Sequence, residues 1–292
     1  MKKFDVSTDS TADLYYEEIK KDGIYFVPLN FTIESDGKLE EFSDNFKTNS
    51  EYITFYERLQ KGDIAKTSML NLHAHIEHFK NMAKSGVTKA IHFTISYALS
   101  PTVDVANSAV EIVKKDYPNF DCICIESHSA TIGQGFLVKI AVDMRNKGCS
   151  LLETAQYCNE IKLKLKHYFI VDNLMHLKRG GRISSTRAFI GTILNLKPIL
   201  SFNKSGSLEL IGKANGMKKA IKNIATQFEK FKIHKNHNII YIVHSGNELL
   251  AKNLADEFSK LEKDINCEIR MVGPVIGSHL GPNAVGYGFI SE

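Results

Sequence analysis

The alternation of short β-rich runs with amphipathic helical patterns constrains the fold of this chain more than any other feature. Apolar residues recur every three or four positions within 72–79, 103–117, 221–231 and 250–261, as they do on the buried face of a helix. Runs typical of strands occupy 90–96, 122–127, 169–172, 199–202, 207–211, 239–244 and 269–272. Such alternation favours a mainly parallel sheet with helices on its faces.

The composition is that of a globular protein. Of the 292 residues, 43% are hydrophobic and 24% are charged, so a disordered chain is not expected. The 37 basic residues exceed the 33 acidic ones by a net charge of only +4. For a chain of this length, that excess is too small to indicate nucleic acid or an anionic membrane as a partner.

Cysteine usage and hydropathy both favour a cytoplasmic location. The five cysteines are odd in number, and their spacing is not that of a disulfide framework, so we expect reduced thiols. No stretch reaches the roughly 18 apolar residues of a membrane helix. We therefore expect neither secretion nor stable membrane insertion.

The two halves of the sequence differ in style, which predicts two α/β domains. Pro198–Ile211 looks like a hairpin around Ser205-Gly206, and the strand pattern changes after the basic run 162–166. We place the boundary so that residues 1–160 form an N-terminal domain with a mainly parallel sheet. Residues 161–292 then form a C-terminal domain with a mixed sheet, and a ligand tunnel is expected between the two domains.

Two segments with hydroxyl side chains precede predicted helices in the N-terminal half. Thr67 and Ser68 come shortly before the helix that carries Leu72. Ser100 comes before Pro101, which suits the first turn of the helix starting there. Each segment is explained as a helix N-cap. Alternatively, because helix N-termini favour anions, the two together could hold a carboxylate.

The segment 172–184 contains an arginine that local structure does not explain. Asp172 fits the cap of a short helix, Gly180 fits its left-handed stop, and Ser184 or Ser185 fits the cap of the next helix. Arg182 is then either solvated or held by the Gly-Gly-Arg turn so that it offers paired donors to a carboxylate or phosphate.

A single imidazole lies in a glycine-rich segment near the C-terminus. We interpret Val275–Pro282 as the end of a strand followed by a turn, with His279 between Gly277 and Gly281. An isolated histidine is often structural, but glycines beside it permit close approach of a ligand.

The sequence offers little support for a metal or nucleotide site. His73, His75 and His78 are close in sequence, but His73 is off the helix face that the other two share, and no acidic partners are evident. No phosphate-binding glycine loop and no Gly-x-Ser-x-Gly motif occurs. We expect no metal and no cofactor.

Taken in order, the motifs of this chain resemble those of the DegV family. The matching stretches are T-D-S-T at 8–11, T-S at 67–68, L-S-x-T at 99–102, E-S at 126–127, G-G-R-I at 180–183, L-N-L-K-P-I-L at 194–200 and G-x-H-x-G-P at 277–282. Each is weak alone, but the ordered set spans nearly the whole chain. Pro101 and Asn283 stand where the family usually has glycine, and Asn215 stands where it often has arginine.

The resemblance implies a bacterial two-domain protein that buries one long-chain fatty acid, such as palmitate, and is not itself an enzyme. By position, Thr67, Ser68 and Ser100 would bind the carboxylate, and Arg182 and His279 would complete the site. The family resemblance also implies an ATP-dependent fatty acid kinase as a partner that phosphorylates the presented acid. Asn215, which replaces the arginine common in the family, puts docking to that kinase in doubt.

Two other functions stay open from the sequence alone. A serine-type hydrolase or acyltransferase could use Ser100 and His279, although the nucleophile elbow and a carboxylate to orient the imidazole are not identifiable. A regulatory module could bind lipid only to sense its supply. Turnover of acyl esters favours the first, and ligand-dependent binding of a partner without turnover favours the second.

Overall fold

A computed structural model describes residues 3–183, 195–262 and 265–292. Contacts within the chain divide it into two compact units. Unit 1 comprises residues 1–31, 41–47 and 67–163, and unit 2 comprises residues 32–40, 48–66 and 164–292. The division after residue 163 lies near the expected boundary at 160. The grouping of 32–40 and 48–66 with the C-terminal half was not anticipated.

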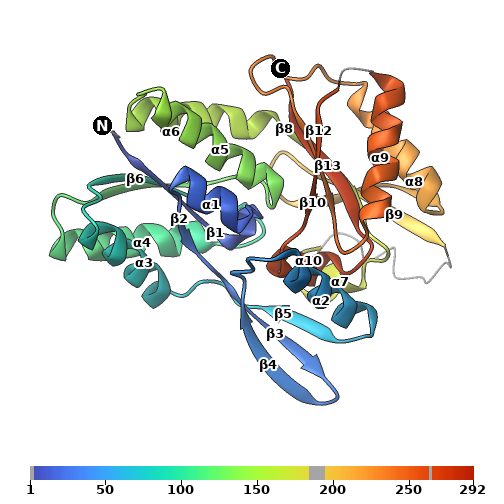
Figure 1. The fold of residues 1–292 in the computed structure, drawn as a ribbon, viewed down its shortest axis with the longest axis horizontal. Helices are drawn as coiled ribbons and strands as arrows, with labels where there is room; N and C mark the ends of the chain where they lie inside the picture. Colours follow the sequence, from blue (N-terminus) through green and yellow to red (C-terminus); the bar gives the residue numbers. More distant parts are fainter. Residues whose placement is uncertain (1–2, 184–194, 263–264) are drawn as a thin grey trace. The chain divides into compact units, whose positions relative to one another are not determined.

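Unit 1 is built on a four-stranded parallel sheet with the order β2-β1-β6-β7 (Figure 1). Its strands are β1 (Asp5–Asp9), β2 (Tyr25–Val27), β6 (Lys89–Thr94) and β7 (Asp121–Glu126). Its helices are α1 (Tyr16–Asp22), α3 (Leu72–Lys84), α4 (Thr102–Asp116), α5 (Ile132–Asn146) and α6 (Leu151–Ile161). Helices α3 and α4 cover one face of the sheet, and α5 and α6 cover the other. The predicted parallel α/β arrangement of the N-terminal half is therefore confirmed.

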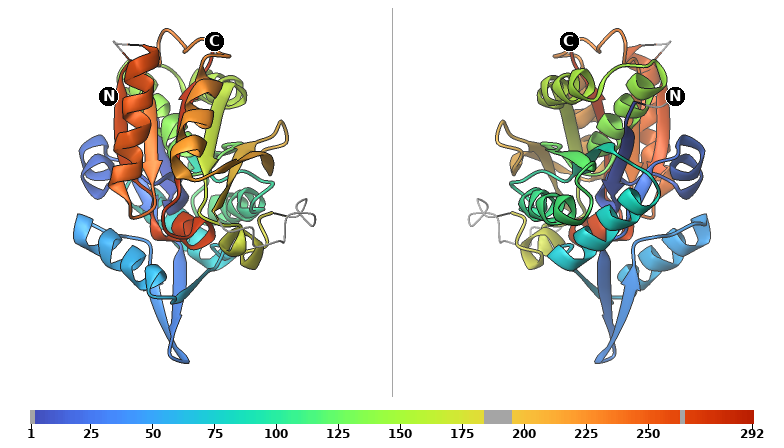
Figure 2. Two further views of the ribbon diagram at one scale, coloured as in Figure 1. Left: turned by 90° about the vertical axis from the view of Figure 1, so that its right-hand side faces the viewer. Right: turned by 90° about the vertical axis from the view of Figure 1, so that its left-hand side faces the viewer.

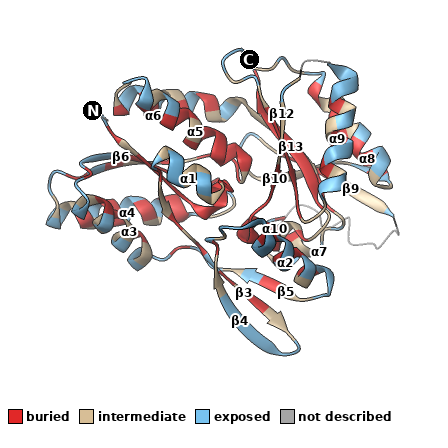
Figure 3. Cartoon of the chain, in the orientation of Figure 1, coloured by how far each residue is buried: buried red, intermediate tan, exposed pale blue. Residues whose placement is uncertain are grey.

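Two short helical turns and the buried helix α5 complete unit 1. The 3-10 turns are η1 (Ser10–Ala12) and η2 (Lys162–Lys164), the latter passing into unit 2. Figure 3 shows that α5 is buried along most of its length. The buried faces of α3 and α4 contribute Phe79, Met82 and Val110 to an apolar cluster.

Unit 2 contains a six-stranded mixed sheet with the order β10-β9-β8-β13-β11-β12. Its strands are β8 (Leu165–Ile170), β9 (Leu196–Phe202), β10 (Leu208–Asn215), β11 (Ile240–His244), β12 (Cys267–Met271) and β13 (Val285–Ile290). Only β11 and β12 pair in parallel, and the predicted β9–β10 hairpin is present. The mixed sheet predicted for the C-terminal half is confirmed.

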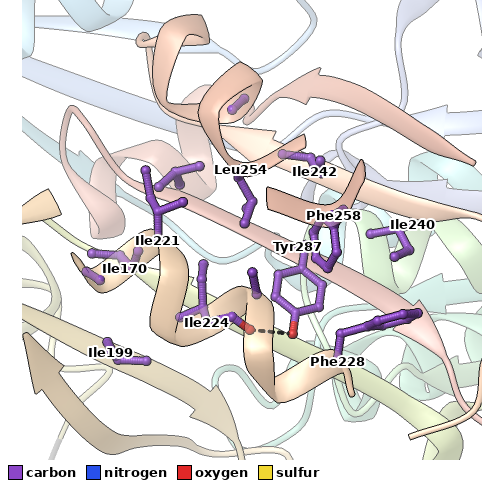
Figure 4. Close-up of a cluster of buried hydrophobic side chains, with 14 of the residues drawn as sticks. Ile170, Ile199, Ile221, Ile224, Phe228, Ile240, Ile242, Leu254, Phe258 and Tyr287 are labelled. Atoms are coloured by element: carbon purple, nitrogen blue, oxygen red, sulfur yellow. Dashed lines mark hydrogen bonds between the residues drawn. The ribbon is translucent and has the colours of Figure 1, made fainter. Parts of the chain in front are cut away.

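Two long helices cover one face of this sheet. They are α8 (Met217–Phe228) and α9 (Glu248–Leu261), which lie side by side in Figure 1. Figure 4 shows their apolar residues packed against the sheet, where the Tyr287 hydroxyl donates a 2.8 Å hydrogen bond to the carbonyl of Ile224. The buried Tyr287 hydroxyl is therefore hydrogen-bonded, as buried polar groups usually are.

The N-terminal segments of unit 2 form a helix and a small sheet. The helix is α2 (Asn49–Gln60), and the sheet has the order β4-β3-β5, with β3 (Asn30–Ser35), β4 (Lys38–Ser43) and β5 (Ile64–Thr67). The β3–β4 hairpin turns at Asp36-Gly37 and is blue in both views of Figure 2. Helix α2 packs against α10 (Pro274–Leu280), which also packs against α7 (Met175–Arg179).

No helix within the described ranges is both long enough and apolar enough to span a membrane.

Candidate functional site

Thr67 and Ser68 lie where β5 ends. Thr67 is the last residue of the strand, and the Ser68 amide donates a 3.1 Å hydrogen bond to the carbonyl of Asn30. The predicted N-cap role is wrong, because the Asn71 side chain caps α3 by accepting from the Ala74 amide at 2.9 Å. Thr67 is half-buried and Ser68 is exposed. Their hydroxyls are therefore not used to start the helix.

Ser100 lies in the connection between β6 and α4. Pro101 occupies the N-cap position and α4 begins at Thr102, so the prediction that Ser100 caps this helix is also wrong. The Ser100 amide donates to the carbonyl of Ser96 at 3.1 Å, and the Glu126 carboxylate accepts from the Tyr97 amide at 3.2 Å. These bonds fix the backbone of the connection and leave the half-buried Ser100 side chain outside the helix.

The starts of α3 and α4 meet in unit 1. The imidazole Nε2 of His75, in the first turns of α3, lies 3.2 Å from the hydroxyl of Thr102, the first residue of α4. The segments that carry Thr67 and Ser100 therefore lead into neighbouring helix N-termini. Free N–H groups and the helix dipoles make such a place favourable for an anion.

Arg182 follows α7 in unit 2. Its guanidinium Nη1 donates to the carbonyl of Gly180 at 2.6 Å, and the side chain is exposed. The expected left-handed stop at Gly180 is wrong: Gly180 has φ −74°, and the left-handed residue is Gly181, with φ +70°.

The start of α7 also differs from expectation. Asp172 does not cap the helix but forms an ion pair with Lys197, and Asn173 accepts from the Met175 amide at 2.9 Å. The predicted caps Ser184 and Ser185 lie outside the described residues.

His279 lies in the last turn of α10, so the predicted strand end at Val275 is wrong. Strand β12 ends earlier, at Met271, and Pro274 begins the helix. Gly180, the C-cap of α7, packs directly on the His279 imidazole, since a Cβ at Gly180 would overlap its Nδ1 atom. The structure thereby brings His279 and the Gly-Gly-Arg turn together.

Burial, with smaller contributions from the charges of Arg182 and His176, lowers the pKa of His279 to about 4. The imidazole is therefore neutral near pH 7 and can donate one N–H bond to an anion. Beside it, the Arg182 guanidinium is always charged. One neutral donor and one cation together suit a carboxylate.

His176 is a member of this cluster that the sequence did not suggest. It lies on α7, hydrogen-bonds the backbone of Ser278 on α10, and its pKa is lowered, chiefly by burial. Its place in the H-L-K-R-G-G-R run was the only available signal. The bond to Ser278 joins α7, which precedes the Gly-Gly-Arg turn, to α10, which carries His279.

The predicted residues thus form two sets. Thr67, Ser68 and Ser100 belong to unit 1, whereas Arg182 and His279 belong to unit 2. The first set offers neutral hydroxyls and helix N-termini, and the second offers an imidazole and a guanidinium.

A second histidine cluster lies beneath α3. The Ser7 hydroxyl lies 2.7 Å from Nε2 of His78 and 2.8 Å from Nδ1 of His92, while His75 and His92 are fully buried. Within the described residues, no three His, Cys, Asp or Glu side chains are grouped so that they could hold a metal ion. The cluster is a hydrogen-bonded part of the core.

The order of motifs and the fold agree with a comparison against known families. A family model described as "Uncharacterised protein, DegV family" matches residues 3–292. The chain belongs to the DegV family. A DegV domain-containing protein of Clostridium perfringens is 36% identical to this DegV-family chain over 292 residues, covering 100% of this chain and 99% of that protein.

Solved structures of DegV proteins share the fold. A DegV family protein of Thermus thermophilus, described by its fatty acid binding, is 26% identical, with a TM-score of 0.82 and 100% of both chains covered. DegV of Bacillus subtilis, described as a fatty acid binding protein, is also 26% identical, with a TM-score of 0.81 and 100% of both chains covered. The arrangement described above is therefore that of DegV proteins.

Proposed function

We propose that this DegV-family protein binds one long-chain fatty acid non-covalently and holds its carboxylate with Thr67, Ser68, Ser100, Arg182 and His279. The full-length likeness to the Thermus thermophilus and Bacillus subtilis proteins, which are described as fatty acid binding, is the observation that carries the proposal. The polar residues of the two units provide its chemistry.

A carboxylate that leaves water needs several donors, since an unpaired one would take up a proton instead. Hydroxyls from Thr67 and Ser100 and the neutral N–H of His279 supply donors without adding charge. Arg182 supplies the compensating positive charge, which makes its hydrogen bonds stronger than neutral ones. The same set offers no group that must be oxidised, reduced or acylated, which fits a binding protein.

The acyl chain contributes most of the affinity in this proposal. At about 0.8 kcal/mol per buried methylene, a chain of about fourteen methylenes gains on the order of 11 kcal/mol before ordering costs. The head-group residues therefore orient the ligand and select for a carboxylate, while the tail retains it.

We further propose that the protein works in the bacterial cytoplasm and presents the carboxylate to an ATP-dependent fatty acid kinase. Arg182 is exposed, so it is accessible to a partner, and a guanidinium suits charge that develops during phosphoryl transfer. Arg182→Ala should then retain bound lipid but lose acyl phosphate formation with a kinase from the same organism. Full acyl phosphate formation by this variant would contradict the role of Arg182.

The carboxylate site is tested by removing its hydroxyls. Losing hydrogen bonds to a charged group costs about 1.5–3 kcal/mol each, so Thr67→Ala combined with Ser100→Ala should weaken palmitate binding at least about tenfold. Ser108→Ala is the matched control, because Ser108 is an exposed hydroxyl on α4 that bonds only the carbonyl of Asp104. Unchanged affinity in a folded double variant would remove Thr67 and Ser100 from the site.

The same assay separates a binding protein from an acyl-transferring enzyme. Hydrolysis of acyl esters that depends on Ser100 would favour a serine enzyme, whereas binding without turnover supports the proposal.

A further inference from the structure

Tyr56 is the most deeply buried polar side chain of α2, and it contacts the segment that leads into α10. Only 1% of the residue is exposed. Its hydroxyl donates a 2.8 Å hydrogen bond to the carbonyl of Val272. Val272 lies between the end of β12 and Gly273, the N-cap of α10. The bond therefore fixes the point at which the chain enters the helix that carries His279.

Two glycines leave the space that the Tyr56 ring occupies. A Cβ at Gly277, in the middle of α10, would lie 2.5 Å from the Tyr56 hydroxyl. A Cβ at Gly246, in the turn after β11, would lie 2.5 Å from the Cβ of Tyr56. Since real Cβ atoms do not approach so closely, the ring sits against bare backbone on both sides. This contact explains why glycine stands two residues before His279.

The other end of α10 is held by hydrogen bonds in which Tyr56 takes no part. The buried Ser245 hydroxyl donates to the carbonyl of Gly281 at 2.7 Å and accepts from the Ala284 amide at 2.7 Å. Asn283, which stands in place of a family glycine, has φ +61° and accepts a 2.9 Å bond from Asn247. With its exit fixed in this way, the placement of α10 depends on what holds its entry.

We propose that Tyr56 is a positioning residue for His279: through Val272 and Gly277 it sets where α10 begins and how closely the helix approaches α2. This inference rests on the proposed fatty acid site and adds a residue from a segment remote in sequence. It also gives a function to the grouping of residues 48–66 with the C-terminal half. Tyr56 itself does not contact the ligand in this account.

Tyr56→Phe tests the inference, and Tyr287→Phe is its matched control. Tyr287 is also buried in unit 2 and also donates a 2.8 Å bond to a backbone carbonyl, but it does so in the core beneath α8 and α9 (Figure 4). Each variant loses one neutral hydrogen bond, so both should lose similar stability. Only Tyr56→Phe should weaken palmitate binding, by about fivefold, and change the His279 pKa measured by NMR without ligand.

A second variant, Gly277→Ala, places a Cβ against the Tyr56 hydroxyl. It should also weaken palmitate binding and change the His279 pKa. Equal effects of Tyr56→Phe and Tyr287→Phe on affinity and on the His279 pKa would overturn the positioning role, as would no effect of either. Because the pKa readout needs no ligand, it reports on positioning even if the wild type fails to bind palmitate. That failure would count against the proposed function alone.

Discussion

The two units contain histidine clusters of opposite character. In unit 1, His75, His78 and His92 lie beneath α3, where the partners of their ring nitrogens are the hydroxyls of Ser7 and Thr102. Burial is the main cause that lowers the pKa of each, and the only charged groups that contribute are the other histidines. Because His75 and His92 are fully buried and only His78 is half-buried, we call this the sealed cluster, and no lysine or arginine contributes to its pKa shifts.

In unit 2, His176 and His279 are only half-buried, and the exposed Arg182 lies close enough to lower the pKa of His279. Low imidazole pKa values therefore have two meanings in one protein. In unit 1 they mark a packed core, whereas in unit 2 they accompany an adjacent guanidinium. The neighbouring guanidinium, rather than the pKa itself, distinguishes the two clusters.

The largest expected effect concerns the sealed cluster at acid pH. The folded pKa of His75 is about 4, below the usual 6.5, so the unfolded state binds more protons between these values. Stability should fall as pH falls through this window, by roughly 2 kcal/mol between about pH 7 and about pH 5 for this one histidine. His75→Gln should remove that loss in urea unfolding measured at the two pH values.

His73→Gln is the control for this measurement, because His73 is exposed on the same helix. If His75→Gln and the wild type lose the same stability on acidification, the sealed character of the unit 1 cluster is incorrect.

A smaller effect is expected from crowding the cluster of His176, His279 and Arg182 in unit 2, which we call the open cluster. Gly180→Ala places a Cβ against the His279 ring while its φ of −74° suits alanine, so His279 must move. Palmitate affinity should fall about tenfold, equivalent to about 1.4 kcal/mol. Gly212→Ala in β10 is the control, since a Cβ there has nothing within 4 Å. Unchanged affinity after Gly180→Ala would mean that His279 is not part of the site.

The smallest expected effect is a change in histidine pKa on ligand binding, which NMR of isotope-labelled histidine can measure for each cluster. A bound carboxylate favours the protonated imidazole, so palmitate should raise the pKa of His279 by roughly half a unit, with Arg182 sharing the negative charge. The pKa of His75 should stay unchanged. A shift of His75 instead of His279 would reverse the assignment of open and sealed clusters.

The sequence predicted the layered parts of the fold well because periodic patterns report burial. The repeat from Val103 to Tyr117 became α4, and the alternating runs became the parallel sheet of unit 1 and the mixed sheet of unit 2. Local signals were less reliable at element ends. Asn71, rather than Thr67 or Ser68, caps α3, and α4 begins one residue later than its sequence suggested, as the ends of helices often shift by one or two positions.

Packing partners remote in sequence could not be predicted. Val275-Ile276 looked like a strand because β-branched residues favour strands, yet Pro274 and contacts with α2 and α7 make the segment a helix. Tyr56 gave no signal of its own, and His176 gave only its place beside the Gly-Gly-Arg motif, since their contacts depend on Val272 and Ser278, about a hundred or more residues away. The candidate site residues that we propose were suggested by ordered motifs, not by periodicity.

Native mass spectrometry of the purified protein tests the central claim most directly. An empty apolar tunnel would be costly because its lining lacks contacts, so the protein should retain a fatty acid from the expression host. The native spectrum should show one long-chain acid per chain, the denaturing spectrum should show the bare chain, and extraction should yield free acid. A covalent adduct at Ser100, or a bare chain in the native spectrum that takes up neither palmitate nor oleate, would contradict the account.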